Sequence, residues 1–383
     1  MGTTKPRVED LMPMIHKADK RLSGISNMMS YCSRIVVIKS VISAMPNHIM
    51  CALKLHFTHS DHLEKSMRIF LWQGKDIEKK GKCLVKWENV CKPKEACGLG
   101  IISLRDQNKA LLMKNLFKFY NCIELPWVQL LWTAYYNNNT VPSVHQQKGS
   151  FWWRSCVSLL GEFKDLVKCK PGMGNSVKLW TDNWQNNILH EEMPQLHSFA
   201  LDKQITLQKA RQYFPLEQHS LFQLPLSIIA AEQLNVLMGK ITVLTKDKDI
   251  WTFPWNGNKY STKKVYLALV KPQPASAPFK WIWKSPCLPK HKFFFWLLLQ
   301  DRLNTKDLMD RKHFFVETKE CVLCDSHSRE TLQHLFFGCT FSSLMWNRLG
   351  ILWRHDLPFI DMLIDAKGRS TNHFFDIALM TGC

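Results

Sequence analysis

Hydrophobic residues recur every three or four positions through residues 25–53, the spacing of one face of an amphipathic helix. The residues with this spacing are Ile25, Met28, Cys32, Ile35, Ile38, Ile42, Met45 and Ile49. Pro46 must break or kink such a helix. A second helix is predicted from about His59 to Trp72. Residues 1–75 are therefore interpreted as a helical region.

The pattern changes between residues 76 and 145, which are interpreted as a basic loop and a helical connector. After a charged turn, Cys83, Val85 and Trp87 alternate with polar residues, which favours a short strand. Residues 107–135 return to helical spacing, with one apolar and one basic side. The run NNNTVPSVHQQKGS has the composition of a loop and marks a boundary.

Residues 146–250 are interpreted as an α+β middle region. WWRSCVSLLGEF favours a short helix, and VKLWTDNW favours a strand after a turn at Pro171 to Asn175. Weaker helical patterns cover residues 204–213 and 226–238. No pattern between residues 186 and 250 indicates a role.

From residue 251 the sequence predicts a strand, a turn at 256–258, a short strand and a helix from about Thr262. KPQPASAPFK is expected to be a loop, since three prolines within seven positions exclude a helix. Pro289 then opens a helix, and Thr305 can cap the next one, with Asp307 near its positive end. Residues 251–350 thus form a second helical domain, followed by a tail at 351–383.

Charge adds a class of partner to this picture. The 383-residue chain holds 51 Lys and Arg against 32 Asp and Glu, a net charge of +19, and 46% of its residues are hydrophobic. Residues 1–95 contain 17 basic and 9 acidic residues, 259–320 contain 13 and 5, and 186–245 contain 4 and 5. Two basic regions on either side of a near-neutral one favour a phosphate-rich partner, although a basic surface can also serve solubility alone.

Neither export nor membrane insertion is indicated. The longest apolar run, Phe293 to Leu299, is far shorter than the roughly 18 residues that a membrane span needs. The first residues have no apolar core of the signal-peptide kind. We therefore expect a reducing compartment, in which the thirteen cysteines are thiols or metal ligands.

The sharpest chemical signal is the series Cys321, Cys324, His334 and Cys339. Two cysteines separated by two residues can hold one metal ion from a tight turn, and the later His and Cys can complete a tetrahedron. Three thiolates and one imidazole suit zinc, and four protein ligands make the site structural. The alternatives are ordinary buried thiols or His327 in place of His334, which its mid-loop position disfavours.

No catalytic set stands out. Gly98 and Gly100 form a lone G-x-G that favours a tight turn over a phosphate-binding loop. Polymerase chemistry needs paired carboxylates that hold two metal ions, and the chain contains no Asp-Asp pair. We find no carboxylate set of the ribonuclease H kind, no Gly-x-Ser-x-Gly and no isolated Cys/His pair. No catalytic residue, enzyme activity or small-molecule substrate is therefore predicted.

Several motifs together resemble plant LINE-type (non-LTR) retrotransposon reverse transcriptases. Residues from about 250 to 346 resemble the zinc-binding domain that follows the polymerase in these proteins, through YSTKKVY, WIWKSPCLPKHKFFFWLLLQDRLNTKDLM, CVLC and ETLQHLFFGC. Upstream, RLSG, SRIVVIKSVISAMPNHIM, FLWQG, CLVKWENVCKPKEACGLGI and WTDNW resemble the thumb segment and the region after it. The likeness spans about residues 10–350 and implies the C-terminal portion of such an enzyme without its palm, as in a truncated element.

One departure concerns the turn before the WTDNW segment. The family usually has an Asp between the two glycines of this turn, whereas Met173 stands here between Gly172 and Gly174. With the zinc site included, the predicted fold is mainly α with small β elements, in several domains. A basic helical N-terminal region comes first, and a C-terminal helical zinc-binding domain follows.

The resemblance and the charge together nominate contacts to RNA or to a primer–template duplex. The candidates are Arg21, Arg34, Lys39, Lys54, Arg68, Lys290, Lys292, Arg302, Arg311 and Lys312. Each could instead belong to a solvated face. Trp281, Trp283 and Trp296 could stack on unpaired bases, but tryptophans beside an apolar run favour a core.

Two other interpretations stay open. The chain could be a zinc-stabilised scaffold that binds proteins, or a non-functional fragment of a decayed element. As a nucleic-acid-binding module it could work with a polymerase supplied in trans. The resemblance implies a nuclear location, and a cytoplasmic ribonucleoprotein is the alternative.

Overall fold

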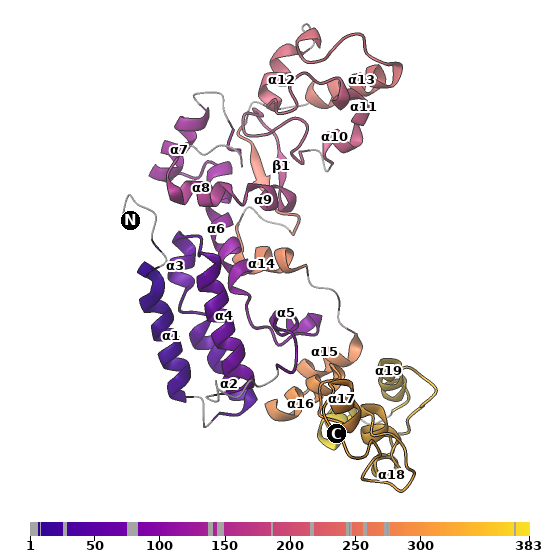
Figure 1. Cartoon of the computed structure of the whole chain (residues 1–383). Coiled ribbons are helices and arrows are strands. Elements are labelled where there is room, and N and C mark those ends of the chain that lie inside the picture. Colours follow the sequence, from indigo (N-terminus) through magenta and orange to yellow (C-terminus); the bar gives the residue numbers. More distant parts are fainter. Residues whose placement is uncertain are drawn as a thin grey trace. The chain divides into compact units, whose positions relative to one another are not determined.

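The computed structural model describes most of the chain. The described residues are 7, 9–25, 29–74, 83–136, 141–143, 149–184, 187–214, 218–242, 245, 247–255, 259–271, 274, 276–370 and 373–383. They form two compact units, each assembled from segments distant in sequence. The sheet unit comprises Met1–Arg7, His48–Leu55 and Arg105–Leu269, and the cluster unit comprises Val8–Asn47, His56–Leu104 and Val270–Cys383. The fold is mainly α with small β elements (Figure 1).

The cluster unit consists of helices and loops. Its helical elements are η1 (Glu9–Leu11), α1 (Met12–Ile25), α2 (Tyr31–Val37), the π-helical η3 (Ile38–Ile42), α4 (Phe57–Trp72), α5 (Trp87–Cys91), η4 (Lys94–Ala96), α15 (Ala277–Lys284), α16 (Pro289–Leu299), α17 (Lys306–Arg311), the π-helical η6 (His334–Gly338), α18 (Thr340–Arg348), α19 (Phe359–Arg369) and α20 (Phe375–Gly382).

The N-terminal part of this unit follows the hydrophobic pattern closely. α4 confirms the helix predicted at 59–72, and it packs against α1 and α2 through buried residues such as Leu63 and Met67. The amphipathic run through 25–53 is divided into α2, η3 and α3 (Asn47–Ala52), of which α3 lies mainly in the sheet unit. Pro46 directly precedes α3, as expected of a residue that cannot continue a helix.

Residues 270–383 complete the core of these N-terminal helices. Phe293 of α16 stacks on Tyr31 with ring centroids 5.2 Å apart. The indole N–H of Trp296 donates to the Cys97 carbonyl at 2.8 Å, and Trp296 is fully buried. The basic N-terminal helices and the segment with the Cys/His series therefore share one folded unit. The domains interpreted from the sequence were contiguous ranges and did not include this association.

The segment at 351–383, described from sequence as a tail, is folded. It forms α19 and α20, which contact α15 and α16. Lys367 joins these helices, because its ammonium group bonds Asp376 at 2.6 Å and lies 4.2 Å from the centroid of the Trp281 ring.

The sheet unit surrounds a short two-stranded sheet. Its elements are α3, α6 (Leu104–Tyr120), α7 (Pro126–Tyr136), α8 (Phe151–Val157), α9 (Leu160–Leu166), β1 (Lys168–Lys170), α10 (Leu189–Glu192), α11 (Pro194–Ser198), α12 (Leu207–Tyr213), η5 (Gln218–Ser220), α13 (Ile228–Thr242), β2 (Ile250–Thr252) and α14 (Thr262–Val270). β1 and β2 are antiparallel, with Cys169 opposite Trp251.

A buried carboxyl group organises the turn after β1. Asp249 accepts hydrogen bonds from the backbone N–H groups of Gly172 and Gly174, both at 2.8 Å, and from the N–H and hydroxyl of Ser176 at 3.0 and 2.7 Å. A Cβ atom on Gly172 would lie 2.0 Å from the Asp247 carbonyl oxygen, so only glycine fits there. The Gly-Met-Gly turn thus holds Asp249 through its backbone, and this contact makes no use of the Met173 side chain.

Several predicted helices are confirmed. α12 and α13 match the helices predicted at 204–213 and 226–238, and α14 begins at Thr262. α16 begins at Pro289, and the Thr305 hydroxyl caps α17 by accepting from the Leu308 N–H at 3.2 Å. The turn predicted at 256–258 lies outside the described residues.

The predicted strands were less successful. No strand forms at 83–87, because Trp87 instead begins α5 and turns its side chain into the core. VKLWTDNW makes only one bridge, between Lys178 and Thr206. The Leu179 N–H donates to the Ile205 carbonyl at 3.0 Å beside this bridge, while the Asp182 carboxyl group accepts from the Lys178 N–H at 2.8 Å. Residues 259–261 form no strand either.

Two helix boundaries also differ from expectation. The helix predicted at 107–135 is interrupted between α6 and α7, where Cys122 adopts a left-handed backbone with φ of 45°. α15 begins at Ala277, inside the segment expected to be a loop, because Pro278 lies in its first turn, where a missing N–H costs no helical hydrogen bond. Within the described residues, no helix combines the length and apolarity needed to cross a membrane.

We expect Asp249→Asn to destabilise the sheet unit by about 3 kcal/mol, since an amide cannot accept all four hydrogen bonds and one of its own donors faces the turn. The exchange rate of backbone amide hydrogens in the peptide spanning residues 168–177 measures how often this turn opens. Asp247→Asn is the matched control, because the Asp247 side chain is exposed. Equal exchange in both variants would contradict the role assigned to Asp249.

Candidate metal centre

The structure brings the four predicted ligands together. The ligand atoms of Cys321, Cys324, His334 and Cys339 all lie within 4.8 Å of one another. The Cys321 and Cys339 sulfurs are 3.9 Å apart, and the Cys324 sulfur lies 3.3 Å from His334 Nε2. Residues 10 to 18 positions apart in the chain thus converge on one point.

Local backbone structure aims these side chains. Cys321 and Cys324 lie on a hairpin, residues 319–330, which is closed by the bonds Cys321 N–H to Ser328 O at 2.9 Å and Glu330 N–H to Lys319 O at 2.8 Å. His334 begins the π-helical turn η6, and Cys339 follows its end and precedes α18. The wider π-helical turn sets the backbone between His334 and Cys339, whose N–H donates to the His334 carbonyl at 2.6 Å.

The separations fit a zinc ion. Tetrahedral zinc, with bonds of about 2.3 Å to sulfur and about 2.0 Å to nitrogen, places two sulfurs about 3.8 Å apart and a sulfur and a nitrogen about 3.5 Å apart. The observed values of 3.9 and 3.3 Å are close to these. Three cysteines and one histidine are a donor set that zinc prefers, and with four protein ligands no position stays open for substrate.

The thiols differ in their surroundings. Burial raises the pKa of Cys321 to about 11, with the Leu323 N–H opposing this effect. The half-buried Cys324 has its pKa lowered to about 6, first by hydrogen bonds from the Ser326 side chain and backbone. Cys324 therefore gives up its proton to a metal ion more readily than Cys321 does.

His327 does not belong to this cluster. Its imidazole bonds Glu320 at 2.9 Å, its side chain is 81% exposed, and the same carboxylate raises its pKa. The position of His327 agrees with the prediction of His334 as the fourth donor. A positive φ of 49° at His327 helps to turn the hairpin.

A buried glutamate joins the hairpin to α17. Glu330 is 7% exposed, and its carboxylate accepts from the Lys306 N–H at 3.0 Å while its carbonyl accepts from the Asp307 N–H at 3.2 Å. The Lys306 ammonium group donates to the Glu320 carbonyl at 2.8 Å, and Arg329 pairs with Asp307 at 2.6 Å. The roles of Glu330 and Lys306 were not predicted from the sequence. The available signals were that Lys306 follows the capping residue Thr305 and that Glu330 lies between two of the predicted ligands.

An aromatic group supports the other side of the cluster. Phe337 stacks on Trp346 at 6.1 Å, and Trp353 contacts both rings at 4.8 and 5.4 Å. The Trp346 indole N–H donates to the Phe336 carbonyl at 2.7 Å. η6 and α18 are thereby anchored in the core, which holds His334 and Cys339 in place.

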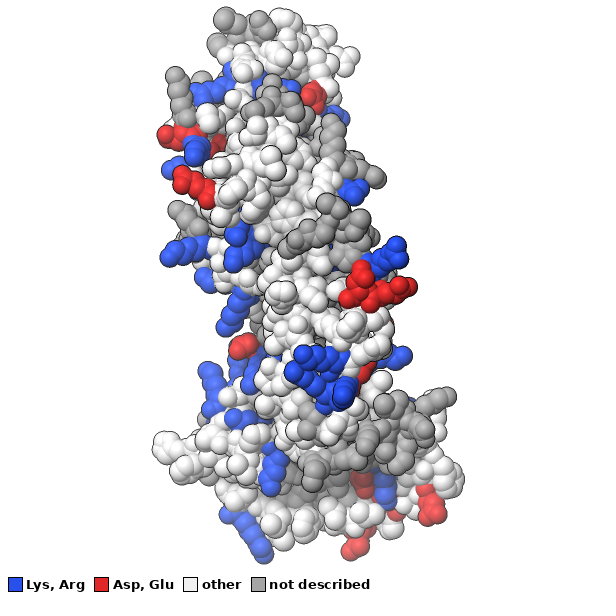
Figure 2. Space-filling view, turned by 90° about the vertical axis from the view of Figure 1, so that its left-hand side faces the viewer, with Lys and Arg blue, Asp and Glu red and all other residues white. Residues whose placement is uncertain are grey.

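The predicted nucleic-acid contacts are dispersed over both units. Arg21 and Lys290 are exposed on α1 and α16, and Lys292 is half-buried. Lys54 lies in the sheet unit and bonds the Ser158 hydroxyl at 2.9 Å. Figure 2 shows one face on which Lys and Arg outnumber Asp and Glu and gather in separate groups.

Two of the predicted contacts make internal bonds. Arg34 donates to the Leu71 carbonyl at 3.2 Å, and Lys39 donates to the Leu99 carbonyl at 2.5 Å. Burial, with a contribution from Lys94, lowers the pKa of Lys39 to about 8. These two side chains support the fold of the cluster unit.

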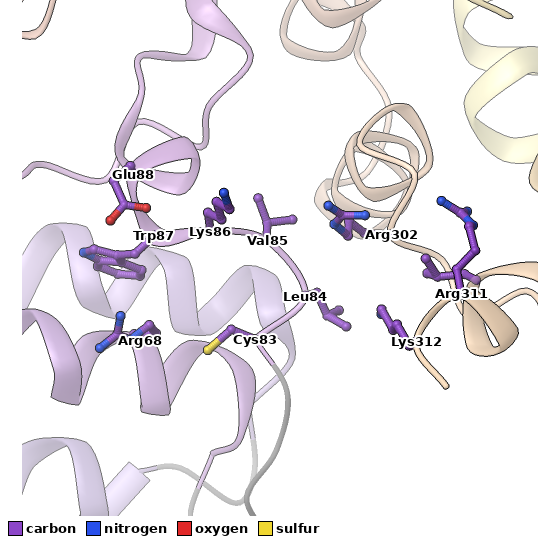
Figure 3. Close-up of a pocket in the computed structure, with 11 residues that line it drawn as sticks. Arg68, Cys83, Leu84, Val85, Lys86, Trp87, Glu88, Arg302, Arg311 and Lys312 are labelled. Atoms are coloured by element: carbon purple, nitrogen blue, oxygen red, sulfur yellow. The ribbon is translucent and has the colours of Figure 1, made fainter. Parts of the chain in front are cut away.

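The other four predicted contacts line one cavity of about 570 Å³ within the cluster unit. They are Arg68 of α4, Arg302 after α16, Arg311 of α17 and Lys312 at its end. Lys86 lies on the same wall as Leu84 and Val85 and was missed, although it stands in the basic run before Trp87. Figure 3 shows Arg68 on one side of the Leu84–Val85 segment and Arg302, Arg311 and Lys312 on the other.

The three tryptophans considered for base stacking make contacts inside the cluster unit. Trp296 is fully buried, as its apolar neighbours indicated. Trp281 lies beneath Lys367, and the Lys94 ammonium group is 4.6 Å from the centroid of the Trp283 ring.

Comparison with known proteins agrees with this geometry. Residues 260–346 match a protein family described as zinc-binding in reverse transcriptase. The matched range contains all four ligands together with α16, α17 and the hairpin. This segment is therefore related to reverse transcriptases, and the Cys3His cluster within it suggests a zinc site.

A longer likeness joins the chain to a plant protein. It is 25% identical over 351 residues to a putative ribonuclease H protein of Arabidopsis thaliana. The similarity covers 88% of this chain and 55% of the relative, so the chain spans about half the length of that protein.

We expect the purified protein to contain one zinc ion per chain and Cys324→Ser to lose it, because three remaining ligands hold zinc far less tightly. Native mass spectrometry measures this stoichiometry. A strong chelator should lower the melting temperature of the wild type but leave the already metal-free variant unchanged. The control is Cys51→Ser, an exposed thiol outside the cluster, and zinc loss there as well would contradict the assignment.

Proposed function

We propose that this chain is the C-terminal portion of a LINE-type, non-LTR retrotransposon reverse transcriptase, and that it binds RNA and primer–template duplexes. The observation that carries this proposal is the Cys3His cluster within a segment related to reverse transcriptases. The basic N-terminal helices belong to the same compact unit as this cluster, which supports a joint role.

In this proposal the metal is structural. Zinc held by Cys321, Cys324, His334 and Cys339 fixes the hairpin to η6 and supplies folding energy. The surrounding residues bind phosphates through charge, so affinity depends on electrostatics more than on sequence.

We also propose that the chain does not polymerise by itself. Paired carboxylates for two metal ions are the chemistry that polymerisation needs, and the sequence has no Asp-Asp pair. A polymerase supplied in trans would then provide catalysis, and nucleotide incorporation by the purified chain would refute this part. We propose a nuclear location, with a cytoplasmic ribonucleoprotein as the alternative, which imaging of the tagged chain would distinguish.

A specific feature favours a second candidate, a protein-interaction scaffold. Phe341, Leu344 and Met345 share one face of α18 and are 53%, 54% and 44% exposed. Exposed apolar side chains at helical spacing suit a protein partner. Association that persists in high salt and is lost in Leu344→Ser would support the scaffold.

We expect the zinc-loaded protein to bind a primer–template duplex and a structured RNA with submicromolar affinity at low salt. Affinity should fall steeply as salt rises, because each phosphate contact releases bound counterions, with a slope of about −0.9 per contact on a logarithmic plot for duplex DNA. Fluorescence anisotropy across a salt series measures this dependence. An absence of binding at low salt would refute nucleic-acid binding and leave the scaffold.

A further inference from the structure

We propose that the cavity between α4, the Cys83–Glu88 segment and α17 is the place where the cluster unit holds successive phosphates of a nucleic-acid backbone. This inference rests on the proposed function and assigns it a site. Arg68, Lys86 and Arg302 provide the cationic groups.

The charge inside the cavity is unbalanced. Five basic side chains line it, and Glu88 is the acidic one among its lining residues. Arg311 is neutralised, because Asp301 and Asp307 each pair with it at 2.8 Å. Arg68, Lys86 and Arg302 therefore face one carboxylate, and an anion that enters would offset their mutual repulsion.

The individual groups are available for an anion. Arg68 and Lys86 make no ion pair with any residue in the described ranges, and Lys86 is exposed. The Arg302 guanidinium group donates to the adjacent Asp301 carbonyl at 3.0 Å, which leaves its other donors for phosphate oxygens. Two arginines suit phosphate in particular, since the planar guanidinium group can donate two parallel bonds to it.

The shape favours a chain over a single ion. A volume of about 570 Å³ is far larger than one phosphate group occupies, and the cations stand on different walls. Leu84, Val85 and the buried Leu308 supply apolar surface between them, which suits the sugars that separate phosphates in a backbone. An acidic peptide would be attracted by the same charge, and its carboxylates can also accept paired guanidinium donors, so it is tested below as a competitor.

The cavity is linked to the metal centre through one of its walls. Leu308 and Arg311 belong to α17, whose first N–H groups are held by Glu330 of the hairpin. Removal of the metal should loosen this wall while leaving Arg68 on α4 in place. Phosphate binding by the cavity is therefore expected to depend partly on zinc.

The test compares two double variants of the zinc-loaded full chain that lose the same charge. Arg68→Gln with Arg302→Gln removes cavity cations, and Lys20→Gln with Arg348→Gln removes exposed cations that neither line the cavity nor belong to the predicted contacts. We expect the cavity variant to bind a primer–template duplex about tenfold or more weakly and to reduce the salt slope by about two, and the control to change affinity severalfold less. Equal losses in both variants would overturn the inference.

A third variant and two competitors distinguish a backbone site from a folding defect and from a site for other anions. Lys86→Gln tests an exposed residue whose loss leaves the core intact, and melting temperature and zinc content show whether each variant is folded. A mononucleotide that competes as well as the duplex would overturn a backbone site, as would polyglutamate that binds more tightly than the duplex. If the wild type itself binds no nucleic acid, the proposed function fails; if it binds and the cavity variant matches the control, this inference alone fails.

Discussion

The cluster unit depends on bringing three sulfurs and one imidazole nitrogen to a single point. Cys321 and Cys324 come from a hairpin, and His334 and Cys339 come from the π-helical turn that follows it. Neither element is large enough to hold this shape through its own apolar core. The shared ligand geometry fixes one element to the other, and Glu330 and the Phe337 aromatic group carry that constraint into α17 and α18.

A polar group also organises a turn in the sheet unit. Asp249 accepts hydrogen bonds from the N–H groups of Gly172, Gly174 and Ser176, so that one buried carboxyl group fixes a tight turn. In both units a group of polar side chains, the Cys3His cluster or Asp249, fixes the backbone where the surrounding elements are short and irregular. The apolar core supplies most of the stability, but it does not determine these turns.

Local signals were the parts of the fold that the sequence predicted well. Pro289 and Thr305 mark helix starts through chemistry contained within one turn, and the structure confirms both. The ligand series was likewise visible from spacing. VKLWTDNW was misread because its pairing stops at one bridge, and Asp182 accepts from the Lys178 N–H within the same segment. The cavity could not be foreseen, since it needs Arg68 and Arg302, 234 positions apart by their numbers, to meet in the folded unit.

The interleaved order of the two units has a consequence for synthesis of the chain. Residues 8–47 and 56–104 of the cluster unit emerge from the ribosome before Arg105–Leu269. Their core is completed by residues such as Phe293 and Trp296, which emerge afterwards. The early helices must wait with apolar faces uncovered while the sheet unit folds, and such faces are prone to aggregation or to capture by chaperones. The four residues of the Cys3His cluster also emerge after the sheet unit, so these early helices stay unfinished until nearly the whole chain has been made.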